Sequence, residues 1–277
     1  MMEAEYQNIS VEQVKKMTGS QHEKKYVLVD VRQENEYQNE HIPGATLIPL
    51  AELAQREAEL PADRPLIFYC RSGKRSQAAA TLIASSRSGS DQKNELYNMV
   101  GGIMAWNGML LSGIPDLKTF TQAESVGRVF HQALELERGA ERFYTALLGQ
   151  VKEEKLKKPL ATLARAEEGH ARILHRHWAA LEKDVAPFDE IYGQLTGDIV
   201  EGNQDIEALL DFFEANMERP CLTAMEMALQ IECMAYDMYR NLAHNFRDKP
   251  LAEVFLDIAQ SEKSHIQIAA ESIALCP

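Results

Sequence analysis

Residues 167–170 read Glu-Glu-Gly-His, and residues 262–265 read Glu-Lys-Ser-His. The two Glu-x-x-His motifs lie 95 residues apart, and a further glutamate, Glu137 or Glu232, precedes each motif by 30 residues. The flanking positions that repeat with the same shift include Phe130/Met225, Ala133/Ala228, Ala140/Ala235 and Tyr144/Tyr239. One such motif is common in proteins, but two copies at a matched distance from a third glutamate indicate a duplicated pair of helices.

The residues around each motif have the spacing of a buried helix face. Between residues 126 and 147, apolar side chains recur in alternating steps of four and three, and Glu137 lies among them. The stretch 156–174 has the same steps and contains Glu167 and His170, which share a face because they are three residues apart. The second copy repeats this pattern. We therefore expect four helices to direct four carboxylates and two imidazoles into one interior.

This set of inward-facing groups predicts a bound cation. A single inward Glu or His is usually a hydrogen-bonded core residue, but buried carboxylates without a partner are strongly unfavourable, and here they occur in two-fold register. Carboxylates combined with two imidazoles suit iron or manganese better than zinc or copper. We expect two iron ions per chain, with manganese as the alternative. The expected metal ligands are Glu137, Glu167, His170, Glu232, Glu262 and His265.

Residues 120–277 resemble a ferritin-like di-iron domain, and within that group the rubrerythrin and erythrin branch. The matching signature is Glu-x-x-Ala followed by a tyrosine, as in Glu137, Ala140 and Tyr144, together with both Glu-x-x-His motifs. The resemblance implies an all-α four-helix bundle with a long crossover, here at about 184–219. Two departures stand out. Ala235 occupies the position where peroxidase-type rubrerythrins carry an extra glutamate, and no Cys-x-x-Cys pair provides their rubredoxin-like iron site.

The first part of the chain alternates short apolar runs with amphipathic segments. This alternation predicts an α/β fold with a mainly parallel sheet covered by helices on both faces. Ser10 and Ser76 are the expected N-caps of two of the helices. The expected strands are 26–31, 45–49, 66–69 and 95–99, and the expected helices are 11–17, 34–39, 51–59, 76–85 and 103–111.

Cys70 directly follows one of these apolar runs, where chemistry is commonly found in parallel sheets. The next residues, 71–76, are Arg-Ser-Gly-Lys-Arg-Ser and lead into an alanine-rich helix. Such a loop can direct successive amides toward an anion, and the helix N-terminus and the cations add positive potential. Both effects lower a thiol pKa, so we expect Cys70 to be largely thiolate near neutral pH. An inert buried cysteine beside a solvated basic turn is the alternative.

Residues 5–115 resemble the rhodanese domain. The resemblance rests on residues 29–32 (Val-Asp-Val-Arg), Glu36-Tyr37, 41–45 (His-Ile-Pro-Gly-Ala), 70–76 and 101–106 (Gly-Gly-Ile-Met-Ala-Trp). It implies that Cys70 accepts a sulfane sulfur as a persulfide and passes it to a nucleophile, and that Asp30 and Arg32 organise the loop. The loop has six residues, whereas the related dual-specificity phosphatases use one more, so phosphatase activity is not expected. The implied catalytic residues are Cys70, Arg71, Ser72, Gly73, Lys74 and Arg75, in which the amides form a cradle and Lys74 and Arg75 attract an anionic donor.

Composition agrees with two domains, which we place at 1–116 and 117–277 with a linker at 112–116. The net charge of −13 argues against a nucleic-acid partner. No apolar run approaches the roughly 18 residues of a membrane span, and the N-terminus lacks a signal-peptide pattern. The four cysteines form no closely spaced pair. We therefore expect a cytoplasmic protein without membrane contact or structural disulfides.

Three readings of function remain open from the sequence. The first is a sulfurtransferase, using thiosulfate or a persulfide as donor and a thiol as acceptor, coupled to a di-iron site of peroxidase or oxidase type. In this reading both sites act on reactive oxygen or sulfur species, and the electron donor is unassigned. A sharper hypothesis is that the Cys70 persulfide supplies electrons or substrate to the metal site. The second is an iron-storage protein with a sulfur-relay domain. The third keeps the bundle as a scaffold with an empty site. By analogy with ferritin-like domains, we expect a homodimer.

Overall fold

The computed structural model describes residues 6–88, 94–115, 117–123 and 125–276. The chain divides into two compact units. Residues up to Ile114, together with Tyr239–Gln260, form one unit, and Pro115–Met238, together with the residues from Ser261 onward, form the other. Asp116, which ends the predicted linker and the predicted first domain, lies outside the described residues.

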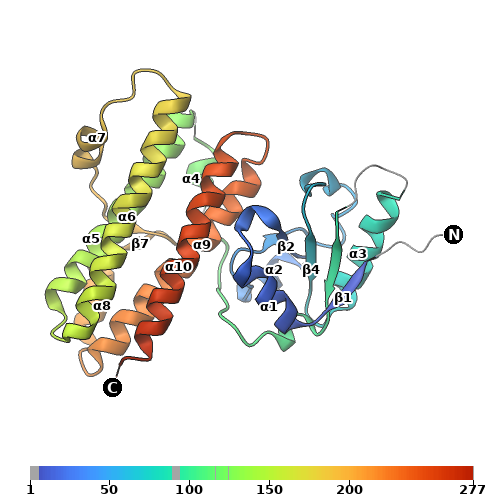
Figure 1. The fold of residues 1–277 in the computed structure, drawn as a ribbon, viewed down its shortest axis with the longest axis horizontal. Coiled ribbons are helices and arrows are strands. Elements are labelled where there is room, and N and C mark those ends of the chain that lie inside the picture. The colour runs from blue at the N-terminus through green and yellow to red at the C-terminus, as the bar shows by residue number, and fades with distance from the viewer. Residues whose placement is uncertain (1–5, 89–93, 116, 124, 277) are drawn as a thin grey trace. The chain divides into compact units, whose positions relative to one another are not determined.

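The first unit contains a five-stranded parallel sheet (Figure 1). The strand order is β1-β5-β4-β2-β3, which places β4 in the centre. The predicted α/β fold with a parallel sheet is therefore confirmed. The strands are β1 (Gln7–Ile9), β2 (Val27–Asp30), β3 (Thr46–Leu47), β4 (Leu66–Tyr69) and β5 (Leu96–Met99).

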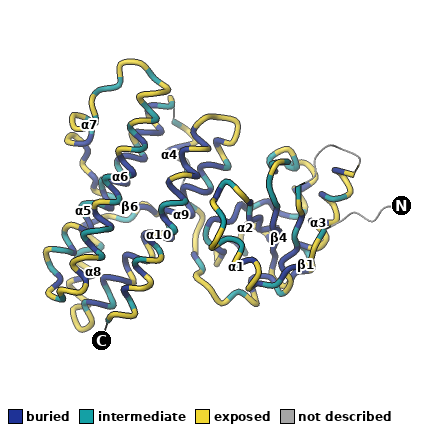
Figure 2. The backbone as a smooth tube through the Cα atoms, viewed as in Figure 1, coloured by how far each residue is buried: buried dark blue, intermediate teal, exposed yellow. Residues whose placement is uncertain are grey.

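Residues of β4 alternate between two hydrophobic cores on opposite faces of the sheet. Ile67 and Tyr69 pack in one core with Val14 of α1. Phe68 packs in the other, with Ile83 of α3. Because both faces are covered, β4 is buried along its whole length, as the dark blue trace in Figure 2 shows. The helices of this unit are α1 (Val11–Ser20), α2 (Glu34–Asn39) and α3 (Lys74–Ser86), with short 3₁₀ turns η1 (Glu23–Lys25), η2 (Glu57–Glu59) and η3 (Gly102–Ala105).

Several local predictions for this unit were right and three were wrong. Ser10 caps α1 through a capping box, as expected. The predicted helix at 51–59 consists of turns and η2, because Leu53 is its single buried residue and prolines flank it at 49 and 61. The predicted helix at 103–111 stops after η3, and the chain then continues to an isolated bridge between Leu111 and His41. Ser76 is not an N-cap, since α3 begins at Lys74 after Gly73.

The second unit is helical, and the predicted long helices are present. The long helices are α5 (Val126–Gln150), α6 (Glu154–Leu181), α9 (Pro220–Asn245) and α10 (Leu251–Ile273), and the short α4 (Lys118–Thr121) precedes them. The end of α9 from Tyr239 and the first part of α10 up to Gln260 are grouped with the first unit. The apolar stripes of the long helices share one core, in which Tyr144 and Leu147 of α5 and Leu160 of α6 lie with Met225 of α9 and Ala269 of α10. The predicted period of four and three residues therefore identified the buried face correctly.

The crossover between α6 and α9 contains more structure than expected. It holds α7 (Phe188–Gln194), a two-stranded antiparallel hairpin of β6 (Ile199–Val200) and β7 (Gln204–Asp205), and α8 (Ile206–Ala215). The helical stretch predicted at about Ile206–Met217 corresponds to α8. The hairpin was not predicted, because two-residue strands have no detectable period.

The cysteines correct one further prediction. Cys221, in the first turn of α9, and Cys276, just beyond α10, form a disulfide across 55 residues. The expected absence of structural disulfides was therefore wrong, because long sequence separation says nothing about spatial proximity. Cys70 and Cys233 are free and buried.

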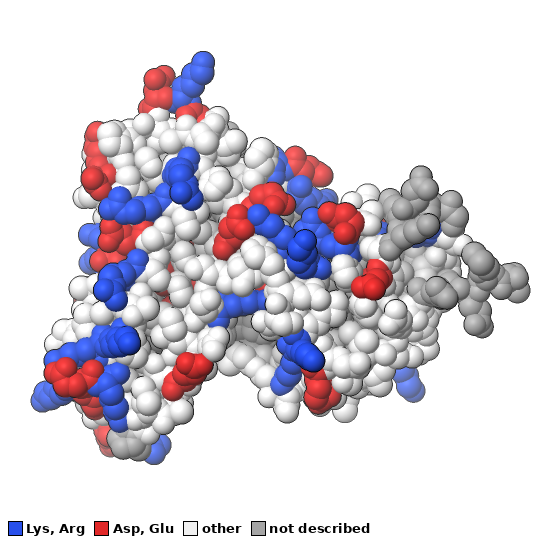
Figure 3. Space-filling view, in the orientation of Figure 1, with Lys and Arg blue, Asp and Glu red and all other residues white. Residues whose placement is uncertain are grey.

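Within the described residues, no helix has both the length and the apolar composition that a bilayer span requires. On the face drawn in Figure 3, acidic and basic side chains are interspersed. The excess negative charge of the chain therefore does not form one continuous patch on that face.

Candidate functional site

The first candidate site is the loop that follows β4 in the first unit. Cys70 is 1% exposed, and its Sγ accepts a hydrogen bond from the amide of Gly73 at 3.2 Å. Gly73 has φ +95°, a conformation that glycine adopts without strain and that turns the loop back toward the sulfur. The Ser76 hydroxyl lies 3.5 Å from the same Sγ and 2.7 Å from Asn98 Oδ1, so its single proton can be donated to either acceptor.

These hydrogen bonds change the acidity of the thiol. Burial raises the pKa of Cys70. Hydrogen bonds from Ser76, Ser72 and Gly73 outweigh burial and leave that pKa below its ordinary value. The direction agrees with the prediction of an acidic thiol. The amide of Ser76 takes part as well, one residue beyond the predicted cradle.

The glycine pair that follows β5 closes over this loop. Gly102 has φ +57°, and a Cβ there would lie 2.3 Å from the carbonyl oxygen of Cys70. The amides of Ile103 and Met104 donate to the carbonyls of Cys70 and Arg71 at 2.8 and 3.1 Å. These bonds satisfy the two loop carbonyls. The loop amides can therefore donate hydrogen bonds to the sulfur and to an anion bound beside it.

The cationic residues of the loop have different roles in the structure. Arg71 and Lys74 are exposed. Arg75 instead donates to both carboxylate oxygens of Glu36, at 2.6 and 2.7 Å, and this pairing lowers the pKa of Glu36 to about 2. Arg75 therefore anchors the loop to α2. Its charge is already paired, which the sequence did not indicate.

A buried ion pair between Asp30 and Arg32 lies next to Tyr69, the residue that precedes the loop. Arg32 Nη2 lies 2.7 Å from Asp30 Oδ2 and also donates to the carbonyl of Glu40. The guanidinium stacks over the ring of Tyr69, the residue before Cys70, at 5.7 Å from its centroid. Both residues thus hold the end of β4 in place, in agreement with the structural role expected for them.

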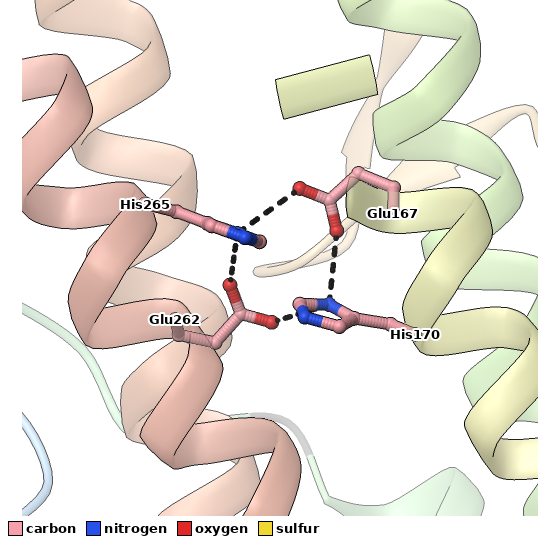
Figure 4. A group of neighbouring side chains, drawn as sticks. All are labelled: Glu167, His170, Glu262 and His265. Carbon is pink, nitrogen blue, oxygen red and sulfur yellow. Dashed lines mark ion pairs between the residues drawn. The ribbon is translucent and has the colours of Figure 1, made fainter. Parts of the chain in front are cut away.

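The second candidate site lies in the interior of the helical unit, where α5, α6, α9 and α10 bring together all six predicted metal ligands. Each of these residues is at most 4% exposed. Glu167, His170, Glu262 and His265 each offer one atom that could bind a metal, and these four atoms all lie within 4.8 Å of one another (Figure 4). Glu137 and Glu232 complete the set, each beside one of the two imidazoles.

Each imidazole faces three carboxylates. His170 Nδ1 lies 3.0 Å from Glu262 and 3.3 Å from both Glu137 and Glu167. His265 Nδ1 lies 2.9 Å from Glu262, 3.2 Å from Glu232 and 3.5 Å from Glu167. Glu262 and Glu167 therefore contact both imidazoles, as Figure 4 shows, whereas Glu137 and Glu232 contact one each.

The electrostatics of this site indicate a deficit of positive charge. Burial, with the charges of Glu232 and Glu262, raises the pKa of Glu167 well above its ordinary value, and burial raises that of Glu232 to about 7. Burial lowers the pKa of His265, but the charge of Glu262 outweighs it and raises the pKa to about 11. Protons on these carboxylates and imidazoles thus partly neutralise the buried negative charge. Bound cations would neutralise that charge in place of the protons.

Several buried atoms in this site lie close to charged partners but make no hydrogen bond of suitable geometry within the described part of the chain. They are Glu167 Oε1, both carboxylate oxygens of Glu262, and both ring nitrogens of His170. Buried polar atoms are normally hydrogen-bonded, and carboxylate and imidazole donors are the ligands that iron accepts. The residues present therefore fit a site that binds a metal such as iron.

One buried carboxylate near this site was missed. Glu201, in the turn between β6 and β7, is 2% exposed. It follows two apolar residues in an irregular crossover, where no helical period could mark it as inward-facing.

Two protein-family models match the segments of the chain that contain these two sites. The sequence model of the rhodanese-like domain matches residues 10–109, and that of rubrerythrin matches residues 129–213 and 224–274. The chain joins a rhodanese domain to a rubrerythrin domain. The predicted fusion of a sulfurtransferase-type domain with a ferritin-like domain is thereby confirmed.

Three known proteins are similar in sequence to about a third of this chain. The uncharacterized protein YqhL of Bacillus subtilis is 38% identical over 87 residues, which are 31% of this chain and 65% of YqhL. The HTH-type transcriptional regulator Rv0324 of Mycobacterium tuberculosis is 43% identical over 88 residues, which are 32% of this chain and 36% of Rv0324. The thiosulfate sulfurtransferase GlpE of Shewanella oneidensis is 33% identical over 102 residues, which are 37% of this chain and 93% of GlpE. The chain thus spans less than two thirds of the first two relatives.

Proposed function

We propose that the rhodanese domain transfers sulfane sulfur through Cys70. The observation that carries this proposal is the buried Sγ of Cys70 beside the Gly73 amide and the Ser76 hydroxyl, which lower its pKa. Support comes from the similarity to GlpE, a thiosulfate sulfurtransferase. The donor class is thiosulfate or a persulfide, and the acceptor is a thiol.

The transfer takes place in two displacements. The Cys70 thiolate attacks the outer sulfur of thiosulfate, the sulfur–sulfur bond of the donor breaks, and its electron pair leaves with sulfite. The new bond makes Cys70 a persulfide, whose negative charge the Gly73 amide and the Ser76 hydroxyl stabilise. An acceptor thiolate then attacks the terminal sulfur and releases Cys70 as a thiolate. The exposed Arg71 and Lys74 attract the anionic donor.

The direct test is the mass of the protein after incubation with thiosulfate. Wild-type protein should gain the mass of one sulfur atom on the peptide that contains Cys70, and it should produce thiocyanate when cyanide is the acceptor. Cys233→Ser, which removes the other free cysteine, is the matched control. If Cys70→Ser produced thiocyanate at the wild-type rate, the proposal would be wrong.

We further propose that the rubrerythrin domain holds two iron ions on Glu137, Glu167, His170, Glu232, Glu262 and His265. Bound iron would supply a redox centre for peroxide or dioxygen. The protein contributes a dry interior, since each ligand is at most 4% exposed, and it orients Glu232 through the hydroxyl of Tyr144 at 2.6 Å. Manganese in the same position would redirect the redox chemistry.

The test of the metal site is elemental analysis of protein purified without air. About two irons per chain are expected, and Glu167→Ala and Glu262→Ala should each lose metal. Glu168→Ala is the matched control, because Glu168 lies on the same helix, pairs with Arg172 and is only partly buried. Wild-type protein that takes up no metal after reconstitution would contradict the proposal.

We propose that the two domains are coupled, with the persulfide formed through Cys70 as the reductant for the metal site. In the balanced reaction two hydropersulfides each give up one electron and one proton and join as a polysulfide, while hydrogen peroxide accepts both electrons and both protons to form two waters. Peroxide consumption with thiosulfate and a thiol should therefore fall in Cys70→Ser. Equal consumption in Cys70→Ser and wild type would separate the two activities.

A further inference from the structure

The crossover hairpin brings an additional carboxylate into the interior of the rubrerythrin domain. Its turn begins at Glu201 and continues through Gly202 and Asn203, both with positive φ, at +79° and +57°. This conformation reverses the chain within three residues. Glu201 is 2% exposed, although it lies in a connection between helices, where charged residues normally face solvent.

The hairpin is seated closely against two ligand-bearing helices. On α5, a Cβ at Gly139 would lie 1.8 Å from the carbonyl oxygen of Ile199, so only glycine permits this approach. On α9, Met234 lies against Gly202 and accepts a hydrogen bond from Gln204 at its sulfur, at 3.1 Å. Gly139 and Met234 each come two residues after a metal ligand, Glu137 and Glu232. The hairpin therefore contacts both helices about 3 Å along their axes from these two ligands, from the helical rise of about 1.5 Å per residue.

Further contacts fix the approach to this hairpin along α5. Arg142 donates to the carbonyl of Gly197 at 2.8 Å and lies 2.9 Å from Asp198. The amide of Gly197 donates to Glu135 at 2.9 Å. These polar contacts hold the residues that lead into β6 against α5.

One oxygen of the Glu201 carboxyl group, Oε2, is buried without a hydrogen-bond partner among the described residues. Burial, together with the charges of Glu137, Glu262 and Glu232, raises the pKa of Glu201 well above its ordinary value. A buried carboxylate in this position is unfavourable unless a cation or a proton neutralises it.

We infer that Glu201 is a fifth metal-binding carboxylate of this site, and thus its seventh ligand, supplied by the crossover hairpin. This inference rests on the proposed di-metal function. On α9 the residue three positions after Glu232 is Ala235, whose side chain offers no ligand. The chain thus provides its additional carboxylate from an irregular turn, where a rotation about side-chain bonds can move it toward or away from a cation.

The test measures Co(II) binding to the full chain, because the visible absorption of this ion reports its ligands. Wild type should bind two Co(II). Glu201→Gln removes the charge and keeps the shape, and it should weaken at least one Co(II) by about ten-fold or more and shift the visible band. Glu207→Gln, which changes an exposed glutamate on α8, should leave both unchanged.

A second variant separates ligation from a general effect of charge. Glu201→Asp keeps the charge but shortens the side chain, so direct ligation predicts an altered band and weaker binding. A wild-type band and affinity in either Glu201→Gln or Glu201→Asp would overturn the inference. Wild type that binds no Co(II) would overturn the di-metal proposal itself, whereas two Co(II) in wild type with unchanged variants would overturn only the role of Glu201.

Discussion

The hydroxyl of Tyr144 on α5 donates to Glu232 Oε1 on α9 at 2.6 Å, and both residues are buried. This bond crosses the interior between the two copies of the duplicated helix pair. It fixes one carboxylate oxygen of Glu232, and the other lies 3.2 Å from His265. Tyr144 therefore orients the metal ligand Glu232 and is not itself one of the proposed ligands.

Tyr144→Phe should destabilise the metal-free protein and weaken metal binding. The substitution leaves one oxygen of Glu232 buried without its donor, which costs about 1–3 kcal/mol of unfolding free energy. Thermal unfolding of the metal-free protein and a Co(II) titration would measure the two effects. Tyr97→Phe removes a hydroxyl that bonds Glu95 near the surface, and it should change neither. Equal stability of Tyr144→Phe and wild type would show that the bond contributes nothing.

The thiol of Cys70 should titrate below the ordinary value of 9.0, because its hydrogen bonds favour the thiolate. Ser76→Ala removes one donor and should move the midpoint upward. Ultraviolet absorbance of the thiolate against pH measures this midpoint. Cys233 does not interfere, since burial raises its pKa to about 12. A midpoint that is the same in Ser76→Ala and wild type would exclude the hydroxyl as the cause.

Breaking the disulfide between Cys221 and Cys276 should destabilise the rubrerythrin domain. The bond closes a segment of 55 residues, for which loop-closure entropy predicts about 4 kcal/mol. Chemical unfolding of Cys276→Ser measures the loss, with Cys233→Ser as a control that removes a free cysteine. If reductant lowered the stability of Cys276→Ser as much as that of wild type, the effect would come from elsewhere.

The stability of the metal-free protein should depend on pH through Glu232. Burial raises the pKa of this carboxyl from 4.5 to about 7. A raised carboxyl pKa stabilises the fold below pH 4.5, and this stability is lost as pH rises toward 7, because only the unfolded state ionises freely there. Glu232→Gln cannot ionise, so the difference in unfolding free energy between wild type and Glu232→Gln should change across this window. Parallel pH profiles would contradict the assignment.

Sequence periodicity predicted the ligand-bearing helices well, because a duplicated pattern of buried positions repeats the same physical requirement twice. It placed Glu137 and His170 on the inner faces of their helices, where both are buried. Alternation of strands and helices likewise predicted the parallel sheet and the place of Cys70 at its edge. These features follow from regular elements, whose periods are visible in the sequence.

Irregular and long-range features could not be predicted in this way. Strand β1 has one buried residue, Ile9, which is too weak a signal. The pairing of Arg75 with Glu36 joins a loop to a separate helix, and nothing in either segment indicates the other. The disulfide and the burial of Glu201 could not be predicted for a similar reason. Both depend on where the chain returns in space after a connection that has no hydrophobic periodicity in its sequence.

The position of Glu201 also bears on the symmetry of the metal site. The six helix-borne ligands come in two matched sets of three, and alone they would surround two equivalent cations. A connection between the two repeats occurs only once, so the carboxylate that it carries has no counterpart. If Glu201 binds one cation, as we propose, that half of the site is more anionic than the other, and two identical ions would differ in affinity and in the potential at which they gain or lose an electron.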